Sequence, residues 1–237
     1  MTGRFITFEG TEGGGKTTQI QILGERLRAL GRSVRIVREP GGTPIGEEIR
    51  HTLKESEANR AMTSEAELLL MNASRAQLVR EVIRPALAAG EIVLCDRFYD
   101  STTAYQGYGR QLDLGRVQAI IDFAVDRTRP ELTVLLEIPL AVSEARRLSR
   151  QAEPPEAVSH STGSKPPFEP PVRDRMEEAD RAFFERVQRG FKAIASAEPK
   201  RVRVIDATQP IETVSAEIWA MVRPLVSDLQ GTDTCSV

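Results

Sequence analysis

One short segment constrains this chain more than any other. Residues 10–17 read GTEGGGKT, which fits the pattern G-x-x-x-x-G-K-[ST], and they stand between the apolar run Phe5 to Glu9 and a helical pattern that starts near Gln19. A glycine-rich turn between a strand and a helix directs successive backbone N–H groups, and the positive end of the helix, at phosphate oxygens. The sequence therefore predicts a phosphate-binding loop at this position.

Apolar runs of strand length recur along the chain, and most of them do not alternate with polar residues. They cover Phe5 to Glu9, Val34 to Arg38, Ile92 to Cys95, Leu132 to Ile138 and Val202 to Ile205. Such runs are typical of strands that are buried on both faces. The helical patterns between them cover Gln19 to Leu30, Ser64 to Ala89, Leu114 to Arg127 and Ser215 to Val226. This alternation predicts an α/β fold in which helices cover both faces of a five-stranded parallel sheet.

Composition narrows the class of protein. The chain has 237 residues, of which 40% are hydrophobic and 28% charged, so we expect one globular domain over 1–237. The net charge of −2 offers no field for a nucleic-acid backbone. No apolar run is long enough to span a membrane, and no signal-peptide pattern follows Met1, so we expect no membrane association and a cytoplasmic protein.

A proline-rich segment interrupts the pattern late in the chain. Between Pro154 and Pro171, 6 of 18 residues are proline, a composition that excludes a helix and has little apolar surface to bury. Helical patterns flank it on both sides. We interpret it as an insertion between two helices, and we expect the polar tail 229–237 to be flexible.

The phosphate-binding loop contains the residue types that bind a nucleoside triphosphate together with Mg²⁺. Lys16 supplies a mobile positive charge for the β and γ phosphates, and the Thr17 hydroxyl suits a bridging Mg²⁺. Asp96 ends the third apolar run and can reach the metal or its waters, so Thr17 and Asp96 are the candidate metal ligands. The candidate ATP-binding residues are Gly10, Thr11, Glu12, Gly13, Gly14, Gly15, Lys16, Thr17 and Thr18.

Two further segments follow predicted strands, at the edge of the sheet where α/β proteins bind ligands. Arg38 opens the segment REPGGT, and Asp96 opens DRFYDSTTAYQG, in which Arg97 is a two-point anion donor. An arginine beside the acidic residue favours a second anionic substrate. The residues alone leave open whether water, a protein, a nucleoside or a nucleotide receives the phosphoryl group, and whether Asp96 and Arg97 form only a structural ion pair.

Together these motifs resemble a known family. The phosphate-binding loop, REPGGT, the segment ASRAQ at 73–77 and the DR…S…AYQG pattern look like bacterial thymidylate kinases, over nearly the whole chain. The resemblance implies a P-loop NTPase fold and an enzyme that uses Mg-ATP to phosphorylate dTMP to dTDP, in dTTP biosynthesis. It also implies a helical lid region at 146–175, which contains the proline-rich insertion, and a homodimer.

The resemblance also assigns roles to single residues. It makes Arg97 the ligand of the acceptor phosphate, Arg75 the donor to the thymine carbonyl, and Tyr105 the ring that crowds the sugar 2′ position. Each has a structural alternative, such as a solvated helix position for Arg75 or a packing role for Tyr105. The residues assigned to dTMP are Glu12, Arg38, Glu39, Pro40, Met71, Arg75, Arg97, Ser101, Thr102, Tyr105 and Gln106.

The chain departs from the family pattern in places. Met71 stands where the family usually has phenylalanine, which is a less rigid surface for a base. Gly13 stands where one branch of the family has an arginine, so the lid should supply that charge, and we name Arg150 and Arg175 as catalytic beside Lys16 and Arg97. Two alternatives stay open: a kinase for another nucleoside monophosphate, and a regulator that binds ATP without catalysis.

Overall fold

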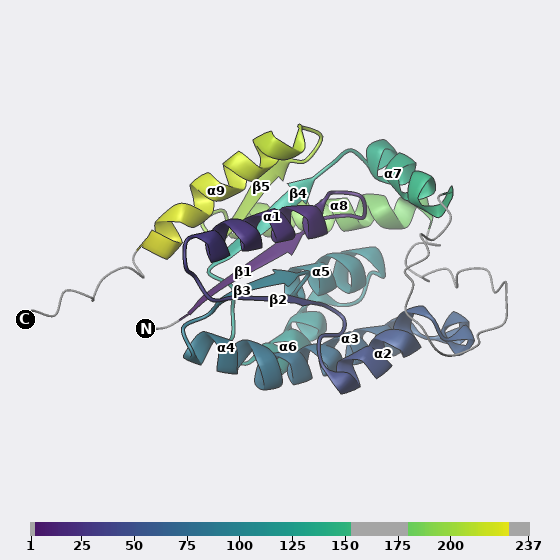
Figure 1. Ribbon diagram of the computed structural model, residues 1–237. Helices are drawn as coiled ribbons and strands as arrows, with labels where there is room; N and C mark the ends of the chain where they lie inside the picture. The colour runs from purple at the N-terminus through teal and green to yellow at the C-terminus, as the bar shows by residue number, and fades with distance from the viewer. Residues whose placement is uncertain (1–2, 153–179, 228–237) are drawn as a thin grey trace, which may run out of the picture.

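The computed structural model describes residues 3–152 and 180–227, which build one sheet covered by helices on both faces (Figure 1). Five parallel strands stand in the order β2-β3-β1-β4-β5. Their bounds are β1 Arg4–Glu9, β2 Val34–Arg38, β3 Ile92–Asp96, β4 Leu132–Glu137 and β5 Val202–Asp206. The predicted fold class is confirmed, and every predicted strand is present within a residue or so of its expected bounds.

The two faces of the sheet carry separate apolar layers because adjacent residues of a strand point in opposite directions. Ile6 lies level with Leu94 and Leu132 on its neighbouring strands, and these side chains pack under α1 Lys16–Ala29 and α9 Ile211–Ser227. Phe5 belongs to the layer on the opposite face. Since both layers are buried, the central strands β1, β3 and β4 have no exposed face, which explains why apolar and polar residues do not alternate in them.

Helices from the middle of the chain cover the second face. They are α3 Ser64–Leu78, the π-helix η2 Val79–Ile83, α4 Arg84–Ala88 and α6 Leu114–Val125, drawn below the sheet in Figure 1. The sequence predicted a helix over 64–89 that Pro85 would bend or interrupt. The interruption is confirmed: the helix widens to π geometry just before Pro85, which lacks an N–H group and crowds the preceding turn.

Several short helices were not predicted from the sequence. α2 Pro44–Lys54 begins at a cap in which Thr43 Oγ1 accepts a hydrogen bond from the Gly46 N–H group. It leads into the short 3₁₀ helix η1 Glu57–Ala61. After β3, α5 Tyr99–Thr102 runs directly into the π-helix η3 Thr103–Gly109.

α7 Leu140–Ala152 and α8 Arg181–Ala197 flank the predicted lid insertion. α8 packs against η3, where Phe183 and Phe191 meet the Tyr105 ring edge to face. The proline-rich stretch 154–171 and the tail 229–237 lie outside the described residues, as does most of the predicted lid. Among the helices of 3–152 and 180–227, none has both the length and the apolar character to cross a membrane.

Candidate active site

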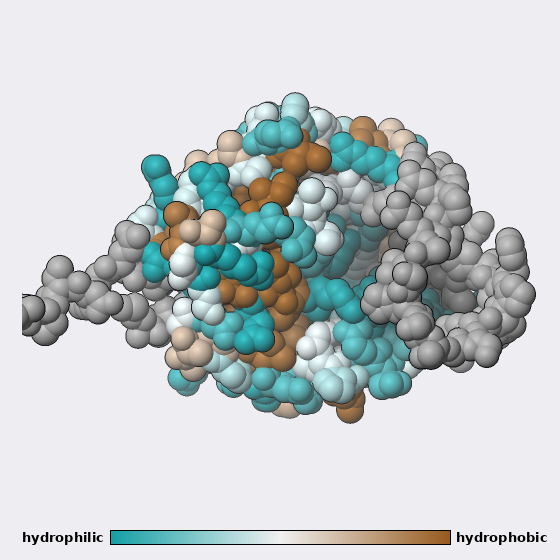
Figure 2. Space-filling model, viewed as in Figure 1, coloured by the Kyte–Doolittle hydropathy of each residue, from teal (hydrophilic) through white to brown (hydrophobic). Residues whose placement is uncertain are grey.

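A cleft of about 230 Å³ opens beyond the carboxyl ends of β1, β2 and β3. In Figure 2 this side of the molecule is hollowed, and polar residues dominate its rim. The cleft is lined by every residue that the sequence assigned to dTMP and by both candidate metal ligands. It is also lined by Arg50, Lys54 and Phe98, which the sequence reasoning missed. The topology therefore gathers segments separated by up to about ninety positions into one site.

The phosphate-binding loop wraps closely around the Lys16 side chain. Lys16 Nζ donates to the carbonyl oxygens of Gly10 at 3.0 Å and Thr11 at 2.9 Å. Burial, with Arg97 nearby, lowers the pKa of Lys16 to about 8. Gly10 is required here, because its φ is 128° and a Cβ atom would lie 2.3 Å from the Leu136 carbonyl oxygen.

The candidate metal ligands lie side by side. Thr17 Oγ1 donates to Asp96 Oδ2 at 2.8 Å, which joins the first turn of α1 to the end of β3. A hydroxyl and a carboxylate suit Mg²⁺, which commonly takes one or two protein ligands and fills its other positions with phosphate oxygens and water. In the described part of the chain, no cluster of three or more His, Cys, Asp or Glu side chains suits a metal held by protein alone.

Glu12, within the phosphate-binding loop, is held by residues from the segment after β3. Arg97 Nη2 donates to Glu12 Oε1 at 2.7 Å, and the Tyr105 hydroxyl donates to both carboxylate oxygens. Burial acts to raise the pKa of Glu12, but Arg97 and Lys16 outweigh it and hold that pKa below its usual value. Tyr105 therefore packs within the protein and Glu12 accepts hydrogen bonds that stabilise its loop, and both side chains also line the cleft.

Arg97 adopts an uncommon backbone conformation, with φ of 68°. A non-glycine residue in this left-handed region costs on the order of 1 to 3 kcal/mol. The conformation turns the side chain into the cleft, where Nη1 donates to Gly10 O and Ser101 Oγ, both at 3.1 Å. Arg97 thus reaches the phosphate-binding loop and the start of α5 at once.

Glu9 is a functional candidate that the sequence reasoning took only as the last residue of a strand. Its buried carboxylate accepts hydrogen bonds from the N–H groups of Phe98 and Ser101 and from the Ser101 hydroxyl. Burial, together with the nearby Asp100, raises the pKa of Glu9 to about 7. The sequence did carry a signal for Glu9, since it is an acidic residue at the end of a mostly apolar strand, as Asp96 is.

Arg75 is 2% exposed, so the solvated-helix alternative for it is wrong. Its Nε and Nη2 atoms bind Glu39 Oε2 at 2.8 and 2.6 Å, and its Nη1 atom donates to Asn72. A further bond from Nη2 to the Phe98 carbonyl oxygen connects α3 to the segment after β3. Glu39 is joined to Pro40 by a cis peptide bond.

The wall opposite the phosphate-binding loop is ordered by buried polar contacts. Gln106 Nε2 donates to Glu67 Oε1 at 2.8 Å, and Arg110 binds both oxygens of the same carboxylate. Arg38 lies at the rim, where it binds the Pro40 carbonyl oxygen and Glu47. A guanidinium group at the rim and an amide side chain fixed within suit an acceptor that has both a charged and a neutral polar end.

The comparisons with known proteins decide which acceptor this is. A family model described as thymidylate kinase matches residues 8–218. The chain belongs to the thymidylate kinase family. The thymidylate kinase of Alcanivorax borkumensis is 43% identical over 95% of this chain and 98% of its own, and that of Deinococcus radiodurans is 46% identical over 93% and 96%.

A solved structure agrees with this family assignment. The crystal structure of thymidylate kinase from Ehrlichia chaffeensis aligns with a TM-score of 0.69 at 30% identity, and covers 94% of this chain and 99% of its own. The P-loop NTPase fold and the bacterial character of the relatives are those expected from the sequence.

In this family member α7, which leads toward the predicted lid region, touches the phosphate-binding loop. Arg146 Nη1 donates to the Gly13 carbonyl oxygen at 2.8 Å, and Ser143 Oγ donates to that of Glu12 at 2.6 Å. The side chain of Arg150 and all of Arg175 lie outside the described residues. Arg146 is one of the arginines near the proline-rich stretch that the sequence offers as candidates for the lid charge, and this contact places its guanidinium group at the phosphate-binding loop.

Proposed function

We propose that this chain transfers the γ-phosphoryl group of ATP to dTMP and releases ADP and dTDP, as a cytoplasmic step toward dTTP. Membership of the thymidylate kinase family makes it an enzyme with this activity. The observation that best supports the residue roles is the position of Arg97, which lies in the cleft and within 3.1 Å of the phosphate-binding loop. An anion held there is adjacent to the donor phosphates.

Catalysis in this scheme consists of placing two phosphates in line and neutralising their charge. Backbone N–H groups of Gly10 to Thr18 and the Lys16 ammonium group bind the donor phosphates. Thr17 and Asp96 would hold Mg²⁺, which would supply positive charge against the phosphates. Arg97 and Arg38 bind the acceptor phosphate. Since Arg97 also bonds to Ser101, its guanidinium group is aimed before the acceptor arrives.

The rest of the cleft selects the nucleoside. Arg75 is fixed by Glu39 so that its remaining donor capacity faces a base carbonyl, and Met71 offers an apolar surface to the ring. Thr102 and Gln106 supply polar contacts at the base edge, and Tyr105 excludes a 2′-hydroxyl group. Glu12 and Pro40 complete the wall around the sugar.

The lid supplies the remaining positive charge. Arg150 and Arg175 flank the proline-rich stretch within the region 146–175 of the single domain, and Arg146 already contacts the phosphate-binding loop. A cation at the transferring phosphoryl group is worth on the order of 10³ to 10⁵ in rate in other phosphotransferases.

The proposed assembly is a homodimer. α3 and α6 pack together, and each presents a large apolar side chain to solvent: Leu69 is 56% exposed and Phe123 is 82% exposed. Exposed apolar groups of this size are typical of protein interfaces. Sedimentation of the full chain should give twice the monomer mass, and Phe123→Glu should shift it toward the monomer.

A coupled assay of ADP release tests the activity. With Mg-ATP, dTMP should stimulate ADP formation far more than dUMP, dCMP, UMP or AMP. Equal stimulation by dTMP and another monophosphate would favour the broader kinase, and ATP binding without ADP formation would favour the regulator. Asp96→Asn should retain its fold and lose the Mg²⁺-dependent rate.

A further inference from the structure

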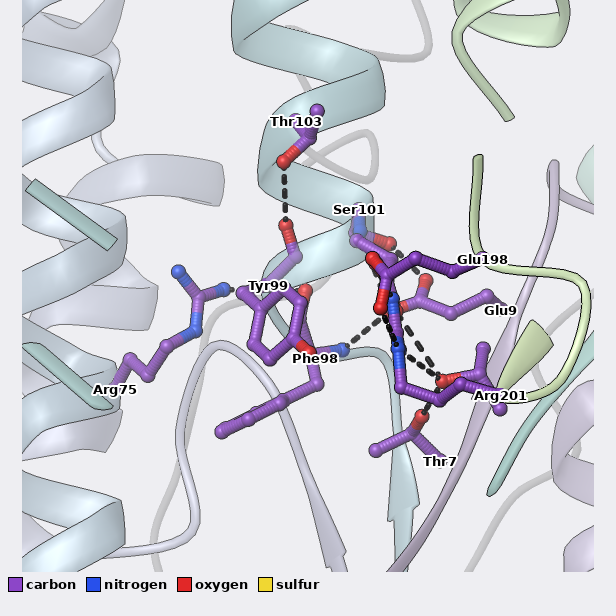
Figure 3. A network of polar contacts seen from close by, with 11 residues as sticks. Thr7, Glu9, Arg75, Phe98, Tyr99, Ser101, Thr103, Glu198 and Arg201 are labelled. Atoms are coloured by element: carbon purple, nitrogen blue, oxygen red, sulfur yellow. Dashed lines mark hydrogen bonds and ion pairs between the residues drawn. The ribbon is translucent and has the colours of Figure 1, made fainter. Parts of the chain in front are cut away.

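The segment that presents Arg97 to the acceptor is held from behind as well as from the cleft. Figure 3 shows Arg75 on one side of the segment around Phe98 and Tyr99, and Glu9 with Arg201 on the other. Because Arg97 is in a left-handed conformation, the segment would relax if nothing outside it fixed its path. The contacts on its rear side therefore matter to the geometry of the site.

One of the rear contacts joins two charged side chains, Arg201 and Asp100. Arg201 Nη1 donates to Asp100 Oδ2 at 2.7 Å and Nη2 to Oδ1 at 2.8 Å, a two-point contact between side chains that are 13% and 3% exposed. Arg201 belongs to the turn between α8 and β5, and is 101 positions from Asp100 in sequence. A buried two-point pair of this kind fixes both position and orientation.

Arg201 is itself held rigidly. Its Nε and Nη2 atoms donate to the two carboxylate oxygens of Glu198, and Nη1 also donates to the Thr133 hydroxyl at 2.7 Å. Thr133 in turn lies 2.7 Å from the hydroxyl of Thr7 in β1. The guanidinium group therefore connects Asp100 to β1, β4 and the end of α8.

Asp100 transmits this restraint to the reacting side through its neighbour. Ser101 follows it directly, is bound by Glu9 through its N–H group and hydroxyl, and accepts a hydrogen bond from Arg97. Displacing Asp100 would move Ser101 and with it the Arg97 guanidinium group. The donor side lies one step further from Arg201. Arg97 also bonds to Gly10 and Glu12 of the phosphate-binding loop, but Lys16 is held by carbonyl oxygens of that loop itself.

We propose that Arg201 is a positioning residue of the acceptor-phosphate site, which holds Asp100 from behind so that Arg97 and Ser101 face the acceptor. This inference rests on the proposed function, because it assigns the Arg97 side of the cleft to the acceptor. Arg201 contacts neither substrate and acts through the backbone of the segment after β3.

The test compares Arg201→Gln, Arg201→Lys and Asp100→Asn with the unaltered chain, in kinetics that vary dTMP and Mg-ATP separately. Arg201→Gln should raise KM for dTMP about tenfold and change KM for ATP less than about twofold, since small displacements of an aligned group are costly. Arg201→Lys keeps the charge but not the two-point contact, and should give about a threefold rise. Arg84→Gln is the matched control, because Arg84 also pairs with an aspartate and a threonine but lies at the surface.

Coupling between the partners gives a second readout. If Arg201 acts only through Asp100, Arg201→Gln combined with Asp100→Asn should raise KM for dTMP no further than Arg201→Gln alone. Thermal unfolding of each variant separates lost stability from lost alignment. A lower unfolding temperature with KM for dTMP unchanged, or equal rises in both KM values, would overturn the proposal.

Three outcomes lead to different conclusions. If Arg201→Gln fails to fold, Arg201→Lys decides, and a KM for dTMP equal to that of the unaltered chain would overturn the proposal. If the unaltered chain shows no dTMP-dependent ADP release, the proposed function has failed, and the role of Arg201 at a dTMP site fails with it. If the unaltered chain is active and the Arg201 variants have the same KM for dTMP, only the positioning role of Arg201 is refuted.

Discussion

Arg97 and Glu12 form an ion pair of 2.7 Å that joins the segment after β3 to the phosphate-binding loop. Glu12 is part of the donor-binding loop and is also assigned to the wall around the dTMP sugar, whereas Arg97 is assigned to the acceptor phosphate. The Tyr105 hydroxyl also bonds to Glu12, so one carboxylate holds both elements in register. Substitutions of Lys16, in the loop, and of Arg97 should separate effects on the use of ATP from effects on the use of dTMP.

Lys16→Ala should lose at least about tenfold in kcat, equivalent to roughly 1.4 kcal/mol, because the side chain neutralises charge on the transferring group. Folding should be little affected, since Lys16 bonds only to carbonyl oxygens of its own loop. Steady-state rates and thermal unfolding measure the two effects. Lys192→Ala removes a surface lysine as the control, and a Lys16 variant with near-normal kcat would refute the role.

Arg97→Lys should impair use of dTMP much more than use of ATP. A lysine keeps the charge but cannot bind phosphate at two points, nor reach Glu12, Gly10 and Ser101 together. We expect KM for dTMP to rise by about tenfold or more, with Arg84→Lys as a surface control. Equal damage to both substrates would argue against an acceptor site at Arg97.

Tyr105→Leu should weaken the preference for dTMP over the corresponding ribonucleotide, because the side chain that crowds the sugar 2′ position is then smaller. Tyr105→Phe keeps the ring, and should keep the preference while it loses the hydrogen bonds to Glu12. The ratio of kcat/KM values for the two nucleotides is the measurement. An unchanged ratio in Tyr105→Leu would mean that this residue serves packing against Phe183 and Phe191 alone.

Alanine variants of the lid arginines should identify the residue that meets the transferring phosphoryl group. Of Arg146, Arg147, Arg150, Arg173 and Arg175, at least one should lose above about a hundredfold in kcat, roughly 2.7 kcal/mol, with little change in ATP affinity. Arg146→Ala is the first to make, since Arg146 contacts Gly13. Normal rates in every variant would place the missing charge elsewhere.

Stability should fall as pH rises from about 4.5 to about 7. Burial raises the pKa of Glu39 from 4.5 to about 7, against the effect of Arg75, so the folded chain binds more protons than the unfolded chain in this range. The stabilisation is complete below about pH 4.5 and is lost as pH passes about 7, at no more than about 1.4 kcal/mol per pH unit for one group.

Urea unfolding of Glu39→Gln at about pH 5 and about pH 8 tests this. The free energy of unfolding of the variant should differ less between the two pH values than that of the unaltered chain does. Glu9 has a raised pKa as well, so part of the dependence should remain. Glu55→Gln, at an exposed position, should behave as the unaltered chain does. An identical pH dependence in Glu39→Gln would contradict the assignment.

Much of the fold could be predicted from the sequence because a strand that is buried on both faces appears as an uninterrupted apolar run. Ile92 to Cys95 is wholly apolar, and such a run has few alternatives to a central strand. The phosphate-binding loop adds a local signal that needs no tertiary context. α5 gave a weaker signal, since its four residues make about one turn and an apolar pattern cannot repeat within them. α2 did carry a signal, because Ile45, Ile49 and Leu53 recur at helical spacing.

The cleft-lining residues could be predicted because strand ends share one edge of the sheet, and the family resemblance named the rest. The side chains to which these residues bond could not be predicted. Nothing in the local sequence pairs Arg75 with Glu39, or Gln106 with Glu67, because these contacts depend on how α3 lies against the segments after β2 and β3. Arg201 was missed for the same reason: near its own position it is one more charged residue before a strand.

The left-handed backbone of Arg97 bears on how this chain was shaped by selection. Glycine adopts such a conformation without steric cost, so Arg97→Gly should relieve backbone strain even as it removes the guanidinium group. The same change would also remove the ion pair with Glu12 and the bonds to Gly10 and Ser101, so its net effect on the free energy of unfolding combines a gain in the backbone with a loss in the side-chain contacts. Under the proposed role of Arg97, directed evolution for heat resistance that accepted glycine at this position would trade activity for robustness.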